Sequence, residues 1–483
     1  MKLTTRKYDA FCQVCSGISF AFILVYMLDI LLLGGGKMTK FAGISTRIVW
    51  FGLAGLSSLP LLLKNIPSLI RNRYLQLIVV FMTWLVICAV RGLAAGHSGS
   101  IIKSDIFGYL NLLLLPTLIC VLNTKKRRDI LAVILVATCA VMVFAAIYLS
   151  FYTFFPLEKK IAVYKFTQDA LLCILFPMTA GTSRVLFHTA TRYFLVAYMI
   201  ALYYAVTTGR KAVKALCWSV MGLFILGIVI SYSRALYAGS GIAVILLLAA
   251  LFLKQDGTWK RATASVLISG VVAVAMLLTL GAVQKTNIIR VAVERTLLSM
   301  SYTPTVTDPT TDTPTSTEDP TVTEDPTATE PPTTKPGYIH NVQAEQESLD
   351  YRETKLRLLR ESIAKNPVFG NGIGTAIDFD DGYVEYIYHD IINKMGVFGL
   401  ALYVAPFLLQ LWNALFGKKR ETEARKHGAY IRLAAVAVIT YFWFITYFNP
   451  CMNTTVGIFC YLLTIVFMDG TLPSQTERVE KLT

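Results

Sequence analysis

The sequence predicts an all-α membrane protein that crosses a lipid bilayer about twelve times and carries one large water-facing segment, residues 284–395. Two observations lead to this prediction. Of the 483 residues, 55% are hydrophobic and only 16% are charged, which is less charge than a soluble chain of this length carries. Apolar runs of about twenty residues, long enough to cross a hydrocarbon core of ~30 Å, recur almost from end to end. Because lipid offers no hydrogen-bonding partners, each run is expected to be a helix.

Thirteen apolar runs are candidate membrane spans. The first is too long for the core of a signal peptide, and we interpret it as the first membrane anchor. Residues 1–283 are expected to hold about nine full spans, residues 396–469 three more, and residues 470–483 a cytoplasmic tail. The runs are 14–33, 44–63, 74–93, 106–123, 130–152, 170–188, 193–208, 213–231, 235–253, 263–283, 396–416, 429–447 and 451–469.

The net charge of +15 comes mostly from short basic clusters between the apolar runs. Such clusters indicate the cytoplasmic side of a membrane protein. No nucleic-acid-binding module accompanies them, so the charge does not indicate a nucleic-acid partner. The clusters are Lys64–Arg73, Lys125–Arg128, Arg210–Lys214, Lys254–Arg261 and Lys418–Arg425.

Placing these clusters inside puts residues 284–395 and the Ser231–Arg234 segment on the outer face, with both chain termini inside. One conflict arises, since three apolar runs separate Lys125–Arg128 from Arg210–Lys214 although both clusters belong inside. We expect one run within 129–208 not to span the membrane. The 193–208 run and the run beside Asp169 are the two candidates, as re-entrant or tilted segments.

The large outer segment divides into two parts. Residues 303–336 are a Thr/Pro/acid repeat with little apolar mass to bury, so they are expected to be extended and disordered. Residues 341–395 are expected to be folded and helical. Apolar residues recur there at helical spacing, Asn366-Pro367 should end the helix, and PVFGNGIG allows tight turns or close approach to a ligand.

Three features could carry chemistry. The first is Ser231-Tyr232-Ser233-Arg234, where the arginine could serve a site or extend toward the membrane surface. The second is Arg352, on the apolar stripe of the outer helix, with Arg360 nearby. Guanidinium groups suit phosphate and pyrophosphate, although a basic amphipathic helix could instead rest on anionic lipid headgroups.

The third feature is Glu385 with His389, which share one face if this stretch is helical. A carboxylate beside an imidazole could act as a general base toward a sugar hydroxyl, although a single histidine at a membrane interface is often structural. Cys12-x-x-Cys15 has a redox or metal spacing, but nothing completes such a site. Motifs of soluble enzymes are absent, and no metal or cofactor is expected.

The ordered set SYSR (231–234), Arg352 followed by Pro367-Val-Phe-Gly-Asn-Gly372, and Gly396-Val-Phe-Gly399 resembles the O-antigen ligase/polymerase family of bacterial envelope glycosyltransferases. This resemblance implies an undecaprenyl-pyrophosphate-linked glycan donor, a glycan acceptor and inverting chemistry without a metal. It also implies that Arg234 and Arg352 hold the pyrophosphate. Many members carry a His-Asn pair eleven residues before the glycine that opens the next span. Here that position holds Glu385-Tyr386, so either Glu385 or His389 in a shifted register would be the base.

The leading hypothesis is a polymerase of the bacterial plasma membrane. Its active site would face outside and join lipid-linked oligosaccharide repeats into an envelope polysaccharide, with other polysaccharide assembly proteins as partners. A ligase that transfers finished glycan to another acceptor is the close alternative. A non-enzymatic transporter of lipid-linked glycans and a scaffold displaying the Thr/Pro segment are alternatives of other classes.

Overall fold

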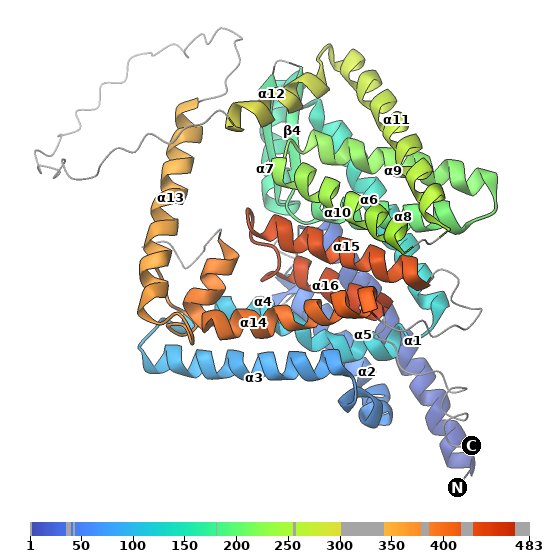
Figure 1. Ribbon diagram of the computed structural model, residues 1–483, viewed down its shortest axis with the longest axis vertical. Coiled ribbons are helices and arrows are strands. Elements are labelled where there is room, and N and C mark those ends of the chain that lie inside the picture. The colour runs from blue at the N-terminus through green and yellow to red at the C-terminus, as the bar shows by residue number, and fades with distance from the viewer. Residues whose placement is uncertain are drawn as a thin grey trace, which may run out of the picture.

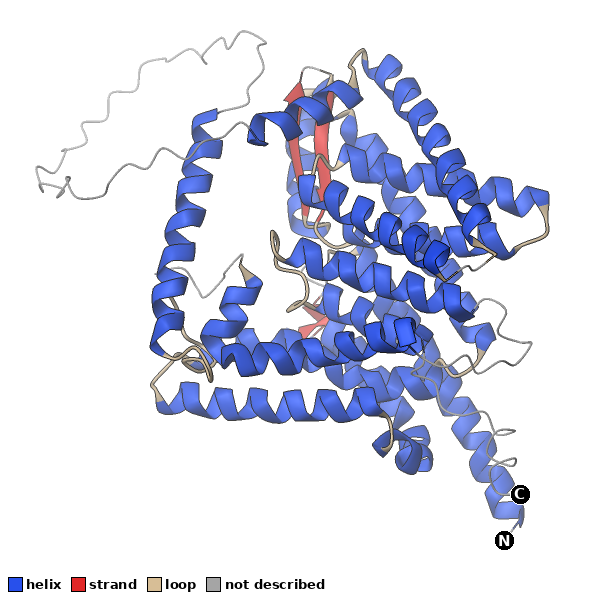
Figure 2. Cartoon of the chain, viewed as in Figure 1, coloured by secondary structure: helices blue, strands red, loops and turns tan. Residues whose placement is uncertain are grey.

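The structure is a computed structural model that describes residues 2–34, 40–41, 44–179, 181–254, 257–300, 342–377, 386–416 and 428–468. Its regular structure is almost entirely helical, with two small antiparallel hairpins (Figure 1 and Figure 2). The helices of the first half are α1 (Lys2–Leu32), α2 (Thr46–Ile70), α3 (Arg73–Ala94), α4 (Gly99–Tyr109), η1 (Leu110–Leu114), α5 (Leu115–Val121), α6 (Lys125–Ser150), η2 (Tyr152–Phe154), α7 (Leu157–Ala170) and α8 (Ala190–Thr207). Those of the second half are α9 (Lys211–Ile230), α10 (Arg234–Leu253), α11 (Trp259–Gln284), α12 (Ile288–Met300), α13 (Val342–Lys365), α14 (Ile387–Phe416), α15 (Gly428–Thr446) and α16 (Thr455–Met468). The strands are β1 (Lys40–Phe41), β2 (Ile44–Ser45), β3 (Cys173–Thr179) and β4 (Thr182–Phe187).

Ten helical segments of the described chain are long and apolar enough to cross a membrane, namely α1, α2, α3, the continuous run α4–η1–α5, α6, α9, α10, α11, α14 and α15. The chain is therefore a polytopic helical membrane protein, as predicted. Two further apolar helices lie among these ten. The 18-residue α8 packs against α6 and α9, and the 14-residue α16 packs against α15. The expected twelve crossings require α8 and α16 to span as well, and that number stays a prediction.

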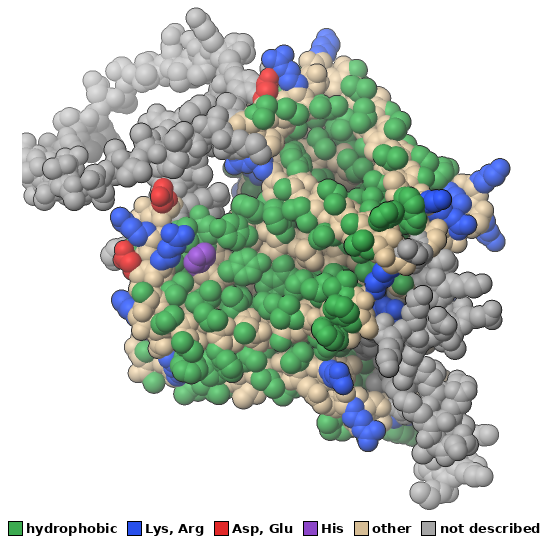
Figure 3. All heavy atoms as spheres, in the orientation of Figure 1, with side chains coloured by type: hydrophobic (Ala, Val, Ile, Leu, Met, Phe, Trp, Pro, Cys, Tyr) green, Lys and Arg blue, Asp and Glu red, His purple; other side chains and the backbone are tan. Residues whose placement is uncertain are grey.

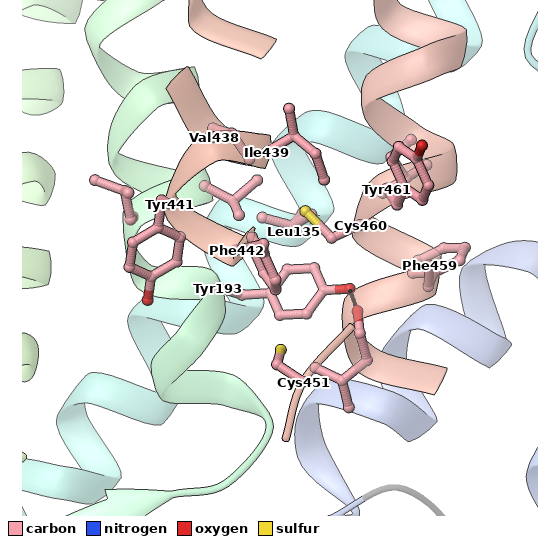
Figure 4. Packing of buried hydrophobic residues seen from close by; sticks show 14 of the residues in the cluster. Leu135, Tyr193, Val438, Ile439, Tyr441, Phe442, Cys451, Phe459, Cys460 and Tyr461 are labelled. Carbon is pink, nitrogen blue, oxygen red and sulfur yellow. Dashed lines mark hydrogen bonds between the residues drawn. The ribbon is translucent and has the colours of Figure 1, made fainter. Parts of the chain in front are cut away.

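The centre of the bundle is built from buried aromatic side chains. Tyr193 of α8 is fully buried and packs edge-on against Phe442 of α15, with ring centroids 5.8 Å apart (Figure 4). Its hydroxyl donates to the Val456 carbonyl at 2.6 Å. Hydrophobic side chains cover the middle of the face seen in Figure 3, while Lys and Arg side chains lie mainly toward its margins. A polar margin around an apolar band is the surface expected of a bilayer-spanning bundle.

The helices alternate in direction, so the bundle has two ends. We call the end where α13 lies, together with the start of α14, the α13 end (Figure 1). In Figure 1 the α2–α3, α5–α6, α8–α9 and α10–α11 connections lie on the side of the bundle away from α13. Four of the five basic clusters are in or beside these connections, so the structure brings them to one side. The fifth, Lys418–Arg425, lies outside the described residues.

Of the two candidates for the run that does not span, the structure selects 170–188, which forms a hairpin and not the re-entrant or tilted segment that was expected. Residues 173–187 form the β3–β4 hairpin, with Cys173 paired to Phe187 and Phe176 paired to Arg184. A two-stranded sheet leaves unpaired backbone groups along both edges, which lipid cannot satisfy. The chain leaves α6 at the α13 end, forms α7 and the hairpin there, and enters α8 from the same end. This removes the orientation conflict, because only α6 and α8 then separate the two basic clusters.

This topology predicts the outcome of cysteine labelling. Lys165 of α7 and Lys126 of α6 are both exposed, but they lie at opposite ends of the bundle. We expect Lys165→Cys to react in intact cells with a membrane-impermeant thiol reagent, and Lys126→Cys to react only after permeabilisation. Eight of the nine native cysteines are buried and Cys217 is half-buried, so the wild-type chain provides a low background. Equal labelling of the two variants in intact cells would contradict the topology.

The large outer segment is partly as predicted. The α13 helix ends at Lys365, directly before Asn366-Pro367, as expected. Two differences arise: α12 was not anticipated, and α14 begins at Ile387 rather than near residue 396. The Thr/Pro repeat at 303–336 and the tail at 470–483 lie outside the described residues.

Candidate functional site

The SYSR segment forms the tight connection between α9 and α10 at the α13 end. Tyr232 adopts a φ of +47°, a conformation that is uncommon for a bulky residue. The turn is held from three directions: Ser231 Oγ donates to the Ile228 carbonyl at 2.6 Å, Tyr237 Oη donates to the Val229 carbonyl at 2.7 Å, and Arg184 Nε donates to the Ser231 carbonyl at 3.0 Å.

Arg234 is the first residue of α10 and is half-buried. The N-terminus of a helix carries partial positive charge. A cation at this position is therefore unfavourable for the helix itself and favourable for an anionic ligand. Anion binding by Arg234 stays a prediction.

The glycine-rich motif Pro367–Gly374 packs its backbone closely against two neighbouring helices. We call residues 366–374 together with Gly92 and Gly396 the glycine clasp. A Cβ on Gly396 would lie 2.0 Å from the Val368 carbonyl oxygen, and a Cβ on Gly92 would lie 2.0 Å from that of Ile373. Side chains at these positions would separate the loop from α3 and α14. Of the two uses expected for the glycines, the structure shows the tight turns, because Gly370, Gly372 and Gly374 all have positive φ. Close approach to a ligand stays a prediction.

Hydrogen bonds close the clasp. The amides of Val397 and Phe398, which begin the second part of α14 after its kink at Gly396, donate to the carbonyls of Pro367 and Val368 at 2.9 and 3.2 Å. Arg91, at the end of α3, donates through its two terminal nitrogens to the Phe369 and Gly370 carbonyls, both at 2.8 Å. The clasp therefore caps a helix that would otherwise have unsatisfied N–H groups.

A buried charge cluster lies beside the clasp. Lys394 Nζ is 2.8 Å from Asp105 Oδ1 and 2.9 Å from Asp390 Oδ1, and its side chain is only 4% exposed. The second oxygen of Asp105 accepts from the Gly374 amide at 3.0 Å. The cluster joins α4, the clasp and α14, so it holds the start of α14 in place.

His389 lies on this supported part of α14. The ring is half-buried, and its Nδ1 has no hydrogen-bond partner among the described residues. Tyr386 packs edge-on against it at 6.0 Å between ring centroids, and Arg360 of α13 is within electrostatic reach. One turn later, buried Asn393 accepts from Ser362 Oγ at 2.8 Å, which ties α13 to α14. The Nδ1 atom is itself buried, so Nε2 is the ring nitrogen that could accept a proton from a bound hydroxyl.

The structure brings together only some of the predicted site residues. Arg360 and His389 lie within electrostatic reach of each other at the α13–α14 junction. Arg234 lies at the same end of the bundle, but no hydrogen bond or ion pair joins it to them in the described part of the chain. Arg352 belongs to α13, and its side chain lies outside the described residues. Glu385 lies outside them entirely, so its pairing with His389 stays a prediction.

Sequence reasoning missed several residues that build this end. Arg91, which anchors the clasp, was not among the predicted site residues. Asp105 and Lys394 are charges on otherwise apolar helices, which is a signal that could have drawn attention to them. Arg184 was missed because residues 170–188 were treated as an apolar run, and Arg295 was missed because it lies in the outer segment 284–395, where no helix was predicted before residue 341.

The site offers acid–base and anion-binding groups. In the described residues, no group of three or more His, Cys, Asp or Glu side chains is arranged to hold a metal ion. Burial raises the pKa of the Cys173 thiol on β3 to about 12, so this cysteine is not a thiolate nucleophile at neutral pH.

When the chain is compared with known protein families and with curated proteins, none matches.

Proposed function

We propose that this chain is a membrane glycosyltransferase that polymerises undecaprenyl-pyrophosphate-linked oligosaccharide repeats into an envelope polysaccharide on the outer face of a bacterial plasma membrane. The observation that carries the proposal is the surroundings of His389. Its half-buried imidazole precedes Asp390 of the buried Lys394 cluster and lies within electrostatic reach of the Arg360 cation. Arg234 adds a second cation at the same end of the bundle.

The proposed reaction is an inverting substitution. A sugar hydroxyl of the incoming unit attacks the anomeric carbon of the growing chain, and the bond from that carbon to the pyrophosphate oxygen breaks. His389 accepts the hydroxyl proton as general base. The leaving undecaprenyl pyrophosphate takes the bonding electron pair, and guanidinium groups stabilise its charge. Arg234, Arg352 and Arg360 are the candidates for this second role.

The test is polysaccharide analysis in cells that make each variant at the wild-type protein level. With His389→Gln, we expect chain elongation to fall on the order of 10²–10⁴-fold, the usual contribution of a general base. Long chains should disappear and single repeats accumulate. Arg234→Ala, Arg352→Ala, Arg360→Ala and Glu385→Gln complete the set of predicted site residues.

Arg357→Ala is the matched control, because Arg357 is an exposed arginine one turn before Arg360 on the same helix. It should retain normal chain lengths. If all the site variants make chains of wild-type length, the site assignment is wrong. If they instead accumulate long chains on the lipid carrier, the enzyme is a ligase.

A further inference from the structure

The helix α7 lies where the membrane-spanning bundle meets the water-facing part of the α13 end (Figure 1). It begins soon after the end of α6, which is a candidate membrane span, with residues 151–156 between them. It leads directly into the β3–β4 hairpin, whose unpaired edges cannot lie in hydrocarbon. One neighbour of α7 is therefore in lipid and the other is outside it, which places α7 near the level of the lipid headgroups.

Two of the faces of α7 are apolar or small, and only one of these is covered. Thr167 and Ala170 are buried and belong to the face that packs against the rest of the protein. Leu157, Ile161 and Tyr164 recur at i, i+4 and i+7, so they share a second face. They are 73%, 63% and 48% exposed. No described element therefore covers this second face, which we call the α7 stripe.

The third face of α7 is charged. Glu158, Lys165 and Asp169 are spaced by whole helical turns, and all three are exposed. A helix with an uncovered apolar face beside a charged face is typical of one that lies in the plane of a membrane surface. The α7 stripe would then enter the lipid, while the charged face would remain in water.

The lipid-facing side of α6 leads to the same place. Val141, Phe144 and Tyr148 are exposed on one face of this apolar helix, as expected of side chains that contact lipid. Lys159 of α7 lies over the last of these rings, with Nζ 5.4 Å from the Tyr148 centroid and 4.5 Å from the Phe155 centroid. Its ammonium group is therefore held where the lipid-facing side of α6 ends. Lys159 is exposed, and an ammonium group has three donors, so it can also bind a phosphate.

We propose that α7 binds the surface of the outer leaflet. The α7 stripe enters the boundary between headgroups and acyl chains, and Lys159 binds the phosphate of an anionic phospholipid such as phosphatidylglycerol. Tyr164 suits this boundary because its ring is apolar and its hydroxyl is polar. Lipid contact would also fix the height of the hairpin, from which Arg184 donates to the Ser231 carbonyl. This inference does not depend on the proposed reaction.

The first experiment measures the depth of the α7 stripe with an environment-sensitive fluorophore on a cysteine. The full chain is labelled at Ile161→Cys or at Lys165→Cys and placed as one copy per nanodisc. We expect the Ile161→Cys label to emit at shorter wavelength and to be quenched by lipids with a nitroxide near the top of the acyl chain. The Lys165→Cys label should emit as in water and be quenched little. The wild-type chain gives the labelling background, since eight of its cysteines are buried and Cys217 is half-buried.

The second experiment identifies the lipid. Nanodiscs contain phosphatidylglycerol and phosphatidylcholine, and the nitroxide is carried by one lipid and then by the other. We expect phosphatidylglycerol to quench the Ile161→Cys label more strongly. Adding Lys159→Gln should lower this preference about fivefold, as expected for the loss of one lysine near an anionic surface. Lys165→Gln is the matched control, because it removes the same charge from the charged face of the same helix and should largely keep the preference.

Each remaining outcome contradicts part of the proposal. An Ile161→Cys label that emits as in water would overturn lipid binding by α7. A label with emission at shorter wavelength that neither nitroxide lipid quenches would also overturn it, because protein would then cover the α7 stripe. Equal quenching by the two lipids, or equal losses in Lys159→Gln and Lys165→Gln, would overturn the assignment of Lys159 to an anionic headgroup.

Discussion

Replacing Gly396 with alanine should prevent the chain from reaching its folded state at normal yield. Gly396 has a φ of +74° and a ψ of 174°, a backbone region that is essentially restricted to glycine and costs other residues about 1–3 kcal/mol. The added Cβ would also lie 2.0 Å from the Val368 carbonyl oxygen, and overpacking of this kind costs about 1–3 kcal/mol. Relief would require moving the loop, which breaks the two hydrogen bonds that cap the second part of α14.

The measurement is the apparent Tm and the monodisperse fraction of detergent-solubilised protein. Gly92→Ala should lower the Tm and the monodisperse fraction in the same way, because its added Cβ would push α3 away from the Ile373 carbonyl of the clasp. Gly55→Ala is the matched control, since a Cβ at Gly55 within α2 would meet no atom within 4 Å. A Gly396→Ala chain that melts like the Gly55→Ala chain would show that the clasp does not hold α14.

Replacing Lys394 with methionine should be the second most damaging change. The cluster of Lys394, Asp105 and Asp390 has a formal charge of −1, and the substitution leaves two buried carboxylates without their shared cation. Removing one partner of a buried ion pair typically costs about 3–5 kcal/mol. We expect a large fall in apparent Tm and loss of activity, because the support of His389 shifts.

The effect of Asp105→Asn on Tm shows whether the cluster stabilises the fold through its charge or through its packing. Asp105→Asn brings the cluster to a formal charge of zero, and its amide oxygen can still accept from the Gly374 amide. Its effect on Tm should be far smaller than that of Lys394→Met. The double variant Lys394→Met with Asp105→Asn should recover part of the loss, since one buried carboxylate is removed. If the single variants are equally unstable and the double variant is no better, the cluster acts through packing and not through charge.

The membrane class and most span positions could be predicted because they depend on local properties of the chain. An apolar run of twenty residues must be helical in lipid whatever its neighbours are. The end of α13 was predictable for a similar reason, since proline restricts the residue before it. The run at 170–188 was the exception. Its alternation of Cys173, Leu175, Val185 and Phe187 as buried residues is that of strands, yet its hydrophobicity alone resembled that of a span.

The candidate site was less predictable. Arg234 and His389 stood out in the sequence because charged and ionisable groups are rare near apolar runs. The partners of the site could not be read in this way. Arg91 contacts residues 369–370, and Lys394 contacts Asp105, across separations of more than 270 residues. Contacts at such distances along the chain depend on how the helices pack.

The sequence by itself determined that this is a multi-span membrane protein and that basic connections gather on one side, because hydrophobic length and charge act locally against a lipid solvent. Only the tertiary structure decided which of the conspicuous residues meet. It placed Arg360 within electrostatic reach of His389 and brought Arg184 to the SYSR turn. In the described chain, no hydrogen bond or ion pair joins Arg234 to Arg360 or His389. The reason is that interhelical packing, and not any single segment, sets where the ends of the helices lie relative to one another.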